Sequence, residues 1–349
     1  MKAWILHSVD DIRLETIDKP LPRRGEALLA VKACGICGSD IPRIYSTGAH
    51  NMPLIPGHEL SGMVETVGDN VDSSWIGKRV GVFPLIPCRR CEQCLKGNYE
   101  LCRNYDYLGS RRDGGFAEYV TVPANNLIEL PQEVPFEDAA MLEPASVAVH
   151  AYRRAIKIAG NNTDITMAIC GAGTIGMLLV EVLMDAGYER ICVITNKESQ
   201  RKRAVELGIS PDRICDSHEV NPAKWLLDEF GGADCFFECV GSIESLLYGI
   251  EGTKPMGTIV TVGNPHGDEN IPRDIYWKIL RNQLTLTGTW NSTFEGDKSD
   301  WTYMLNRIAK GSIKPSALIT HRLSIKDLER GLDIMHHKTE DYCKVMMKI

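Results

Sequence analysis

Apolar positions along the chain fall into zones with different spacing. From about residue 146 to residue 287, short apolar runs alternate with stretches whose apolar residues recur at helical spacing. This alternation predicts a parallel sheet flanked by helices, because each parallel connection requires a crossover. The predicted strands are 165–170, 191–195, 234–239, 258–262 and 284–287, and the predicted helices are 174–186, 199–207 and 243–251.

The flanking zones have a different texture. Residues 1–145 are rich in Gly, Pro and Cys, with β-like runs such as 26–33 and 61–67, which indicates an irregular β-rich domain. The tail predicts helices near 299–309 and 324–337 and a final strand at 344–349. We therefore predict an α/β protein with a parallel-sheet domain at 146–287.

Composition narrows the class of protein. A length of 349 residues suits about two domains, and 44% hydrophobic with 24% charged residues excludes disorder, collagen and coiled coil for the whole chain. The net charge of −7 argues against a nucleic-acid-binding surface. Neither a membrane-spanning run nor a secretion signal is evident, so we expect a cytoplasmic protein whose cysteines are metal ligands or buried thiols.

Four cysteines form the sharpest local motif. Cys88, Cys91, Cys94 and Cys102 have the spacing C-x2-C-x2-C-x7-C. Four thiolates on one short loop can close a tetrahedron around Zn²⁺, which predicts a structural zinc site without an open position. An iron–sulfur cluster and a zinc-ribbon nucleic-acid module are the alternatives.

A glycine-rich turn follows the first strand of the predicted parallel sheet. It reads Gly171, Ala172, Gly173, Thr174, Ile175 and Gly176, between a strand and a helix, which is the context that dinucleotide binding requires. Gly171 allows the tight turn, Gly173 lets a pyrophosphate approach the backbone, and Gly176 lets the helix contact the strand. The alternative is a glycine-rich turn with no ligand.

The second strand of this sheet ends without an acid. An Asp or Glu at this place would bind the ribose 2′-hydroxyl of NAD. The chain has Thr195, Asn196 and Lys197 instead, with Arg201 just beyond. Loss of the acid removes a repulsion against a 2′-phosphate, and the two cations attract one, so NADP(H) is favoured over NAD(H). The alternative is that Lys197 and Arg201 are solvated helix charges and NAD(H) binds.

A second set of metal-binding residue types is scattered along the chain. Cys37, His58, Glu59 and Glu143 offer one thiolate, one imidazole and two carboxylates. Such a set suits a catalytic zinc that keeps an exchangeable position. Their spacing alone does not establish that they meet.

These motifs occur in a familiar order. Segments 37–40, 57–59, the four-cysteine loop, 142–144 and 171–176 together resemble the zinc-dependent medium-chain dehydrogenases over essentially the whole chain. Glu143, in place of a cysteine, is similar to the sorbitol dehydrogenase branch. Segments 39–43, 48–50, 109–119 and 280–281 resemble the polyol-phosphate dehydrogenases of that branch, and the match departs at Thr195, where that type carries an acid.

The resemblance implies a GroES-like catalytic domain made of residues 1–145 and 288–349 and a doubly wound Rossmann domain at 146–287. It places the active site in the cleft between them. It implies that Cys37, His58 and Glu143 surround the catalytic zinc, with Glu59 as a fourth ligand or a close partner and Asp40 as an orienting group. Ser39 would begin a proton relay, although an ordinary turn serine is the alternative. Val262 and Gly263 would lie beside the nicotinamide.

The implied function is a zinc-dependent hydride transfer between NAD(P) and the secondary alcohol of a polyol or a polyol phosphate. The polyol phosphate would be similar to galactitol 1-phosphate, and the product would be a ketose or its phosphate. Substrate contacts would come from Arg43, Tyr45, His50, Arg111 and Arg112, for which surface charge and packing are the alternatives. The strand at 284–287 would pair across a two-fold axis in a homodimer or homotetramer.

Two other functions fit the same fold. A zinc-free quinone or enone reductase would not need Cys37, His58 and Glu143, whose presence argues against it. A non-catalytic nucleotide-sensing protein would bind the cofactor without turnover.

Overall fold

The computed structural model describes residues 1–265, 267–268, 270–296 and 299–349. The chain divides into two compact units, the first made of Met1–Pro144 with Ser292–Ile349 and the second of Ala145–Asn291. Both units combine strands with helices, which confirms the predicted α/β class. None of the described helices is both long enough and apolar enough to cross a membrane.

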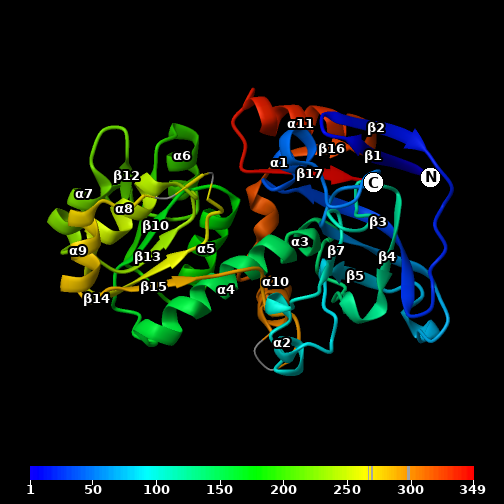
Figure 1. Cartoon of the computed structure of the whole chain (residues 1–349), viewed down its shortest axis with the longest axis horizontal. Helices are drawn as coiled ribbons and strands as arrows, with labels where there is room; N and C mark the ends of the chain where they lie inside the picture. The colour runs from blue at the N-terminus through cyan, green and yellow to red at the C-terminus, as the bar shows by residue number, and fades with distance from the viewer. Residues whose placement is uncertain (266, 269, 297–298) are drawn as a thin grey trace. The chain divides into compact units, whose positions relative to one another are not determined.

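The second unit contains a six-stranded sheet whose neighbouring strands are all parallel (Figure 1). Its order is β12-β11-β10-β13-β14-β15, so the chain starts in the middle, runs to one edge and returns to the other side. A crevice at the carboxyl ends of the strands is expected where the order reverses, between β10 and β13. The strands are β10 (Met167–Cys170), β11 (Ile191–Thr195), β12 (Ile214–Asp216), β13 (Ala233–Glu238), β14 (Thr253–Thr261) and β15 (Thr285–Gly288).

Helices cover this sheet. They are α5 (Thr174–Asp185), α6 (Glu198–Glu206), α7 (Pro222–Phe230), α8 (Ile243–Gly252) and α9 (Arg273–Arg281), of which the last three gather on one side (Figure 1). A Cβ atom added at Gly176 would overlap the carbonyl oxygen of Gly171, so α5 can contact the turn after β10 this closely only without a side chain. The predicted strands and helices of this zone are confirmed, whereas β12, α7 and α9 were not predicted.

The first unit contains a seven-stranded sheet in the order β16-β17-β3-β4-β5-β9, with β8 also pairing with β3. Only β16 and β17 pair in parallel. The strands are β3 (Glu26–Ile36), β4 (Glu59–Val67), β5 (Arg79–Val82), β8 (Tyr119–Pro123), β9 (Leu127–Glu129), β16 (Ile319–Ser324) and β17 (Lys344–Lys348). Two antiparallel pairs complete the unit: β1 (Lys2–Ser8) with β2 (Asp11–Thr16), and β6 (Leu85–Ile86) with β7 (Asp106–Tyr107).

The register of three central strands determines what meets at one end of this sheet. Gly35 near the end of β3 pairs with Glu59 at the start of β4, and also with Met346 near the start of β17. Residues that follow β3, precede β4 or begin β17 are therefore neighbours, although β4 ends at Val67 and β17 begins only at Lys344.

The first unit also contains short helices and turns. They are α1 (Asp40–Pro42), the π-helical turn η1 (Arg43–Thr47), α2 (Glu92–Leu95), the turn η3 (Tyr99–Leu101) and α3 (Phe136–Ala140). Longer helices are α4 (Leu142–Ala159), which continues into the second unit, α10 (Asp300–Ala309) and α11 (Leu328–His337).

Candidate metal centre and nucleotide cavity

Three predicted ligands meet at the end of the β3–β4 pair. Cys37 directly follows β3, His58 directly precedes β4, and Glu59 is the first residue of β4. Cys37, His58 and Glu59 each bring one potential ligand atom into a group in which all atoms lie within 4.8 Å of one another. The antiparallel register of the two strands produces this meeting, which no spacing along the chain could establish.

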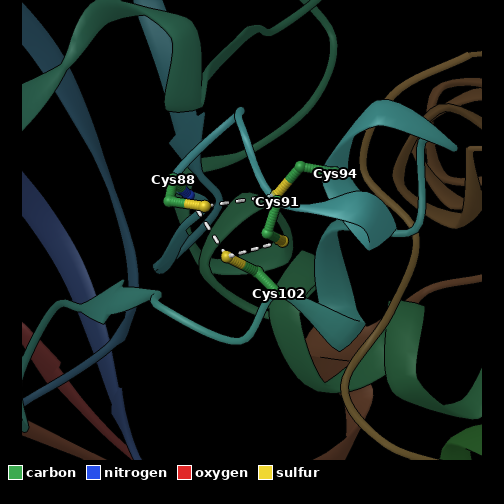
Figure 2. A group of neighbouring side chains, drawn as sticks. All are labelled: Cys88, Cys91, Cys94 and Cys102. Atoms are coloured by element: carbon green, nitrogen blue, oxygen red, sulfur yellow. Dashed lines mark hydrogen bonds between the residues drawn. The ribbon is translucent and has the colours of Figure 1, made fainter.

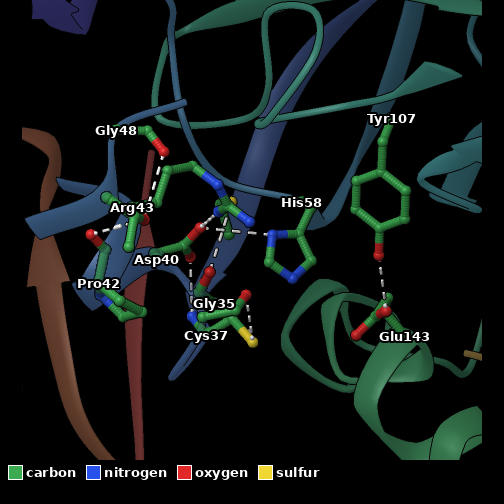
Figure 3. Close-up of polar contacts among 12 residues, drawn as sticks. Gly35, Cys37, Asp40, Pro42, Arg43, Gly48, His58, Tyr107 and Glu143 are labelled. Atoms are coloured by element: carbon green, nitrogen blue, oxygen red, sulfur yellow. Dashed lines mark hydrogen bonds and ion pairs between the residues drawn. The ribbon is translucent and has the colours of Figure 1, made fainter. Parts of the chain in front are cut away.

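Asp40 lies beside this trio and is fully buried (Figure 3). Its Oδ2 accepts a hydrogen bond from the Cys37 backbone N–H at 2.9 Å, and its Oδ1 lies 3.5 Å from His58 Nδ1 and pairs with the Arg43 guanidinium. Burial opposes ionisation of Asp40, but the charges of His58 and Arg43 outweigh it and lower the pKa of the carboxyl. Asp40 therefore holds both Cys37 and His58 in place.

His58 is buried and strongly influenced by its neighbours. Burial alone lowers its pKa, but Asp40 and Cys37 raise it more, to well above the ordinary value in the metal-free protein. A cation is thus favoured between these acidic groups, whether a proton or a metal ion.

Glu59 has a partner that the sequence did not indicate. The Lys344 ammonium, at the start of β17, pairs with Glu59 Oε2, and both side chains are at most 3% exposed. A Cβ atom at Gly35 would overlap both Glu59 Oε2 and the Lys344 side chain, so this glycine makes room for the pair. Burial opposes the charged form of Lys344, but Glu59 and Cys37 raise its pKa.

Glu143 is near the trio but outside it. It lies in the first turn of α4, is 7% exposed, and its Oε1 accepts a hydrogen bond from the Tyr107 hydroxyl at 3.3 Å (Figure 3). Burial raises the pKa of Glu143 to about 7, with opposing effects of His58, which lowers it, and Glu59, which raises it. In the metal-free protein Glu143 can therefore hold or release a proton near neutral pH.

The residues of this centre suit a zinc ion. Thiolate, imidazole and carboxylate are the usual zinc ligands, and a set of three protein ligands is typical of a catalytic site that keeps a position for water or substrate. His58 turns its Nδ1 toward the Asp40 carboxylate, 3.5 Å away, and Glu59 Oε2 pairs with the Lys344 ammonium. The fit to a metal ion therefore rests on the donor set itself, in which Cys37, His58 and Glu59 each bring one ligand atom within 4.8 Å of the other two.

The four-cysteine loop forms a second group (Figure 2). Cys88, Cys91, Cys94 and Cys102 each place a sulfur within 4.8 Å of the other three, and all four are free thiols. The Cys88 and Cys94 sulfurs are 3.9 Å apart, and the Cys102 sulfur accepts from the Cys88 N–H at 3.2 Å.

The thiols of this loop titrate unequally in the metal-free protein. Backbone N–H groups of Cys94 and Arg103 lower the pKa of Cys91 to about 6, whereas burial raises that of Cys94 to about 12. Four sulfurs this close cannot all carry a charge without a cation among them, and a divalent ion with tetrahedral thiolate ligands satisfies that requirement. The loop fits a closed zinc site.

The second unit has a cavity of about 500 Å³ at the carboxyl ends of its strands. Gly171, Ala172 and Gly173 line it, just before α5 begins at Thr174, with Ile175 and Gly176 following in the helix. A Cβ atom at Gly173 would meet nothing within 4 Å, so this glycine borders open space. The helix N-terminus beside the cavity favours an anionic group such as a phosphate.

The far side of the cavity carries the predicted ribose-binding residues. Thr195 and Asn196 line it together with Gln200, Ser217 and His218, and the Thr195 hydroxyl donates to the Gln200 side-chain oxygen. Lys197 is exposed, whereas Arg201 forms an ion pair with Asp216 at 2.5 Å. Asp216 thus offsets the charge of Arg201, and His218 adds a polar group that the sequence did not indicate.

Val262 and Gly263 follow β14 and do not line the cavity. Their backbone N–H groups donate to the Glu238 carbonyl oxygen at 2.8 and 2.9 Å. The buried Glu238 carboxylate accepts three further hydrogen bonds of 2.7 Å, from the Val240 and Gly241 N–H groups and the Ser245 hydroxyl. Glu238 therefore ties together the turns after β13 and β14.

The remaining predicted residues have diverse surroundings. The Ser39 hydroxyl donates to the Cys37 sulfur at 3.3 Å, which places it at the trio. Tyr45 stacks on the His336 ring of α11 with centroids 4.0 Å apart, and His50 is exposed.

The two neighbouring arginines differ in their partners. Arg112 pairs with Glu26 at 2.6 Å. The Arg111 guanidinium lies over the Tyr105 ring, 4.6 Å from its centroid, and its buried Nε has no hydrogen-bond partner within the described ranges. Arg43, as noted, pairs with Asp40.

Sequence reasoning missed Lys344 and Tyr107. Lys344 precedes a buried apolar run in the last strand, where a lysine is typical of a strand end, and nothing local signals its burial. Tyr107 belongs to a two-residue strand, too short to carry a periodic pattern.

Two family models match this chain. Residues 23–132 match the family of alcohol dehydrogenase GroES-like domains, and residues 174–310 match the zinc-binding dehydrogenase family. Galactitol 1-phosphate 5-dehydrogenase of Escherichia coli is 33% identical over 323 residues, which are 91% of each chain.

Two further proteins are similar over nearly the whole chain. Sorbitol dehydrogenase 2 of Saccharomyces cerevisiae is 31% identical over 95% of this chain and 93% of its own. A crystal structure of a zinc-binding dehydrogenase from Sinorhizobium meliloti bound to NADP has a TM-score of 0.90, with 29% identity over 100% of this chain and 99% of that one.

The buried Lys344–Glu59 pair leads to a prediction about stability. Lys344→Met should lower the free energy of unfolding of the metal-free protein by about 3–5 kcal/mol, because Glu59 is left as an uncompensated buried charge. Urea unfolding measures the loss. In the double variant Lys344→Met with Glu59→Gln, which has no such charge, much of the stability should return. A metal-free Lys344→Met protein as stable as the wild type would contradict this assignment.

Proposed function

Because the chain belongs to the zinc-dependent medium-chain alcohol and polyol dehydrogenases, we propose that it interconverts a polyol phosphate and a ketose phosphate with NADP(H). Membership of this family makes the protein an oxidoreductase of polyols that uses zinc and a nicotinamide cofactor. The phosphate, the choice of NADP(H) and the roles of single residues are the proposal.

One observation carries the proposal, namely the convergence of Cys37, His58 and Glu59 at the end of the β3–β4 pair. These three residues would hold the catalytic zinc, with Asp40 fixing Cys37 and His58 from behind. A zinc ion there supplies Lewis acidity toward an alcohol oxygen. The bound nicotinamide supplies the hydride acceptor.

The chain's own residues handle the alcohol proton. Ser39 places its hydroxyl 3.3 Å from the Cys37 sulfur and would pass the proton away from the centre. Glu143, whose pKa is raised to about 7 by burial, would accept a proton from that centre near neutral pH. Glu59 remains a ligand, while Glu143 lies just outside the ligand group.

We assign a second, structural zinc to Cys88, Cys91, Cys94 and Cys102, which gives two zinc ions per chain. The mutual distances of their sulfurs and the closed ligand set support this assignment. With no open position, the loop would stabilise the fold and take no part in the chemistry.

The preference for NADP(H) rests on the end of β11. Thr195 offers no carboxylate to a ribose 2′-hydroxyl, and the exposed Lys197 and the cavity-lining His218 are available to a 2′-phosphate. Arg201 contributes less, because Asp216 already neutralises it.

Among the three candidate arginines, Arg111 is best suited to bind a substrate phosphate. Arg43 and Arg112 already pair with Asp40 and Glu26, whereas the Arg111 Nε lacks a partner in the described structure. Stacking on Tyr105 fixes the plane of the guanidinium and leaves its edge for bidentate hydrogen bonds.

The chain would also self-associate through the second unit. β15 is an edge strand of the parallel sheet, and Leu286 on it is 39% exposed. The nearby amphipathic α9 exposes Tyr276, Trp277 and Leu280. An open edge flanked by apolar side chains supports a homodimer or homotetramer built by pairing of this strand.

Metal dependence tests the proposed function. Polyols and their phosphates should be oxidised by the zinc-loaded protein with NADP+, and removal of the catalytic zinc should abolish turnover while cofactor binding, measured by fluorescence, persists. A reductase without a catalytic zinc, or a nucleotide sensor, would contain only the structural zinc of the four-cysteine loop. Turnover that survives loss of the metal from Cys37, His58 and Glu59 would exclude the proposal.

Thr195→Asp should reverse the cofactor preference. The new carboxylate repels a 2′-phosphate and accepts from a 2′-hydroxyl. We expect the ratio of kcat/KM for NADP+ to that for NAD+ to fall by about tenfold or more, equivalent to about 1.4 kcal/mol. Thr195→Asn, similar in size but neutral, is the control and should change the ratio little. A wild-type protein that already prefers NAD+ would refute the assignment.

Arg111→Met should separate phosphorylated from free substrates. Loss of charge-assisted hydrogen bonds to a phosphate costs about 1.5–3 kcal/mol, so kcat/KM for a polyol phosphate should fall about tenfold to hundredfold, and that for the free polyol should be nearly unchanged. Arg112→Met serves as the matched control, with little discrimination expected. Equal losses for both substrates in Arg111→Met would disprove the phosphate contact.

A further inference from the structure

Tyr107 is the polar neighbour of the metal centre that the proposed mechanism does not use. It ends the short strand β7 and points its hydroxyl at the Glu143 carboxyl, to which it donates a hydrogen bond of 3.3 Å (Figure 3). Its ring meets the His58 imidazole edge-on, with centroids 5.6 Å apart. Tyr107 thus contacts both a trio ligand and the carboxylate beside the trio.

The position of Tyr107 is fixed by its backbone rather than by Glu143. The strand β7 pairs with β6, where Tyr107 faces Leu85, and the Tyr107 carbonyl oxygen accepts hydrogen bonds from the N–H groups of Arg111 at 3.0 Å and Arg112 at 3.2 Å. Glu143 comes from a different element, the first turn of α4. The Tyr107 hydroxyl is therefore positioned independently of Glu143, to which it donates its hydrogen bond.

The phenol is also a reliable donor. Burial raises the pKa of Tyr107 well above its ordinary value, and the charges of Glu143 and Cys37 raise it further. These effects favour the protonated hydroxyl, which donates to Glu143.

Glu143 has the chemistry of a zinc ligand but does not lie in the ligand group. At this centre the described ligand group within 4.8 Å consists of Cys37, His58 and Glu59, although the Glu143 carboxyl is close enough for His58 and Glu59 to affect its pKa. A second carboxylate entering the shell would occupy the position that a zinc alcohol dehydrogenase keeps for its substrate. Something must hold Glu143 outside, and Tyr107 donates directly to it.

We propose that Tyr107 is a positioning residue that keeps Glu143 out of the metal's coordination shell, and so keeps one coordination position open for the substrate alcohol. The inference rests on the proposed function, because it assumes a metal held by the trio. It assigns to Tyr107 neither proton transfer nor direct contact with the metal.

Tyr107→Phe removes only the hydroxyl and tests the inference. Cobalt(II) in place of the catalytic zinc reports its coordination through its visible absorption spectrum. In the variant we expect the entry of Glu143 to alter the cobalt spectrum. Release of the metal to a chelator should be slowed by about tenfold, and kcat should fall by about tenfold. Changes of this size are usual when a residue that orients metal ligands is replaced. KM for the cofactor should stay unchanged.

Two further variants make the result specific. Adding Glu143→Gln to Tyr107→Phe should restore the wild-type cobalt spectrum, since an amide is a poor ligand. Tyr105→Phe, one ring farther from the centre, is the matched control and should have no effect on the spectrum.

The possible outcomes separate this inference from the proposed function. A folded Tyr107→Phe protein with the wild-type cobalt spectrum would overturn the role of Tyr107, even if its activity fell. A spectral change that survives Glu143→Gln would overturn it as well. Failure of the wild-type trio to bind cobalt or zinc at all would instead refute the proposed function.

Discussion

Balancing buried charge is the constraint on which the catalytic centre depends. Acidic and basic groups that are buried or half-buried gather around the end of the β3–β4 pair in the described part of the first unit. The acids are Cys37, Asp40, Glu59 and Glu143, and the bases are Arg43, His58 and Lys344. A charge taken out of water must be paired, neutralised or coordinated. Each basic group at this centre has an acidic partner. A divalent metal ion would supply the further positive charge that the acidic groups need.

Much of the fold could be predicted from the sequence, because its signals are local. Apolar runs alternating with helical spacing identified the parallel sheet, and Gly171–Gly176 located the turn at its centre. The missed elements lacked such signals: β12 has three residues, and α9 exposes Tyr276, Trp277 and Leu280, which hides its inward face. The four-cysteine loop needed no tertiary information, since its ligands lie within 15 residues of one another.

The catalytic centre could be predicted only through resemblance, because its geometry comes from strand register. Gly35 pairs with both Glu59 and Met346, and a shift of one residue in either pairing would separate Cys37 from His58 or Lys344 from Glu59. The ion-pair partners of individual charged residues could not be predicted from the sequence either. Neighbouring residues such as Arg111 and Arg112 have different surroundings because Glu26, distant in sequence, faces only one of them.

The most direct test of this account is anomalous diffraction at the zinc edge from crystals of the zinc-loaded protein. The account predicts two peaks per chain, one among the four cysteines and one within bonding distance of Cys37, His58 and Glu59, with the Glu143 carboxylate beyond bonding distance of the second peak. A peak at the cysteines alone, in the presence of saturating zinc, would show that the buried acids are balanced by protons and that the centre is not a metal site.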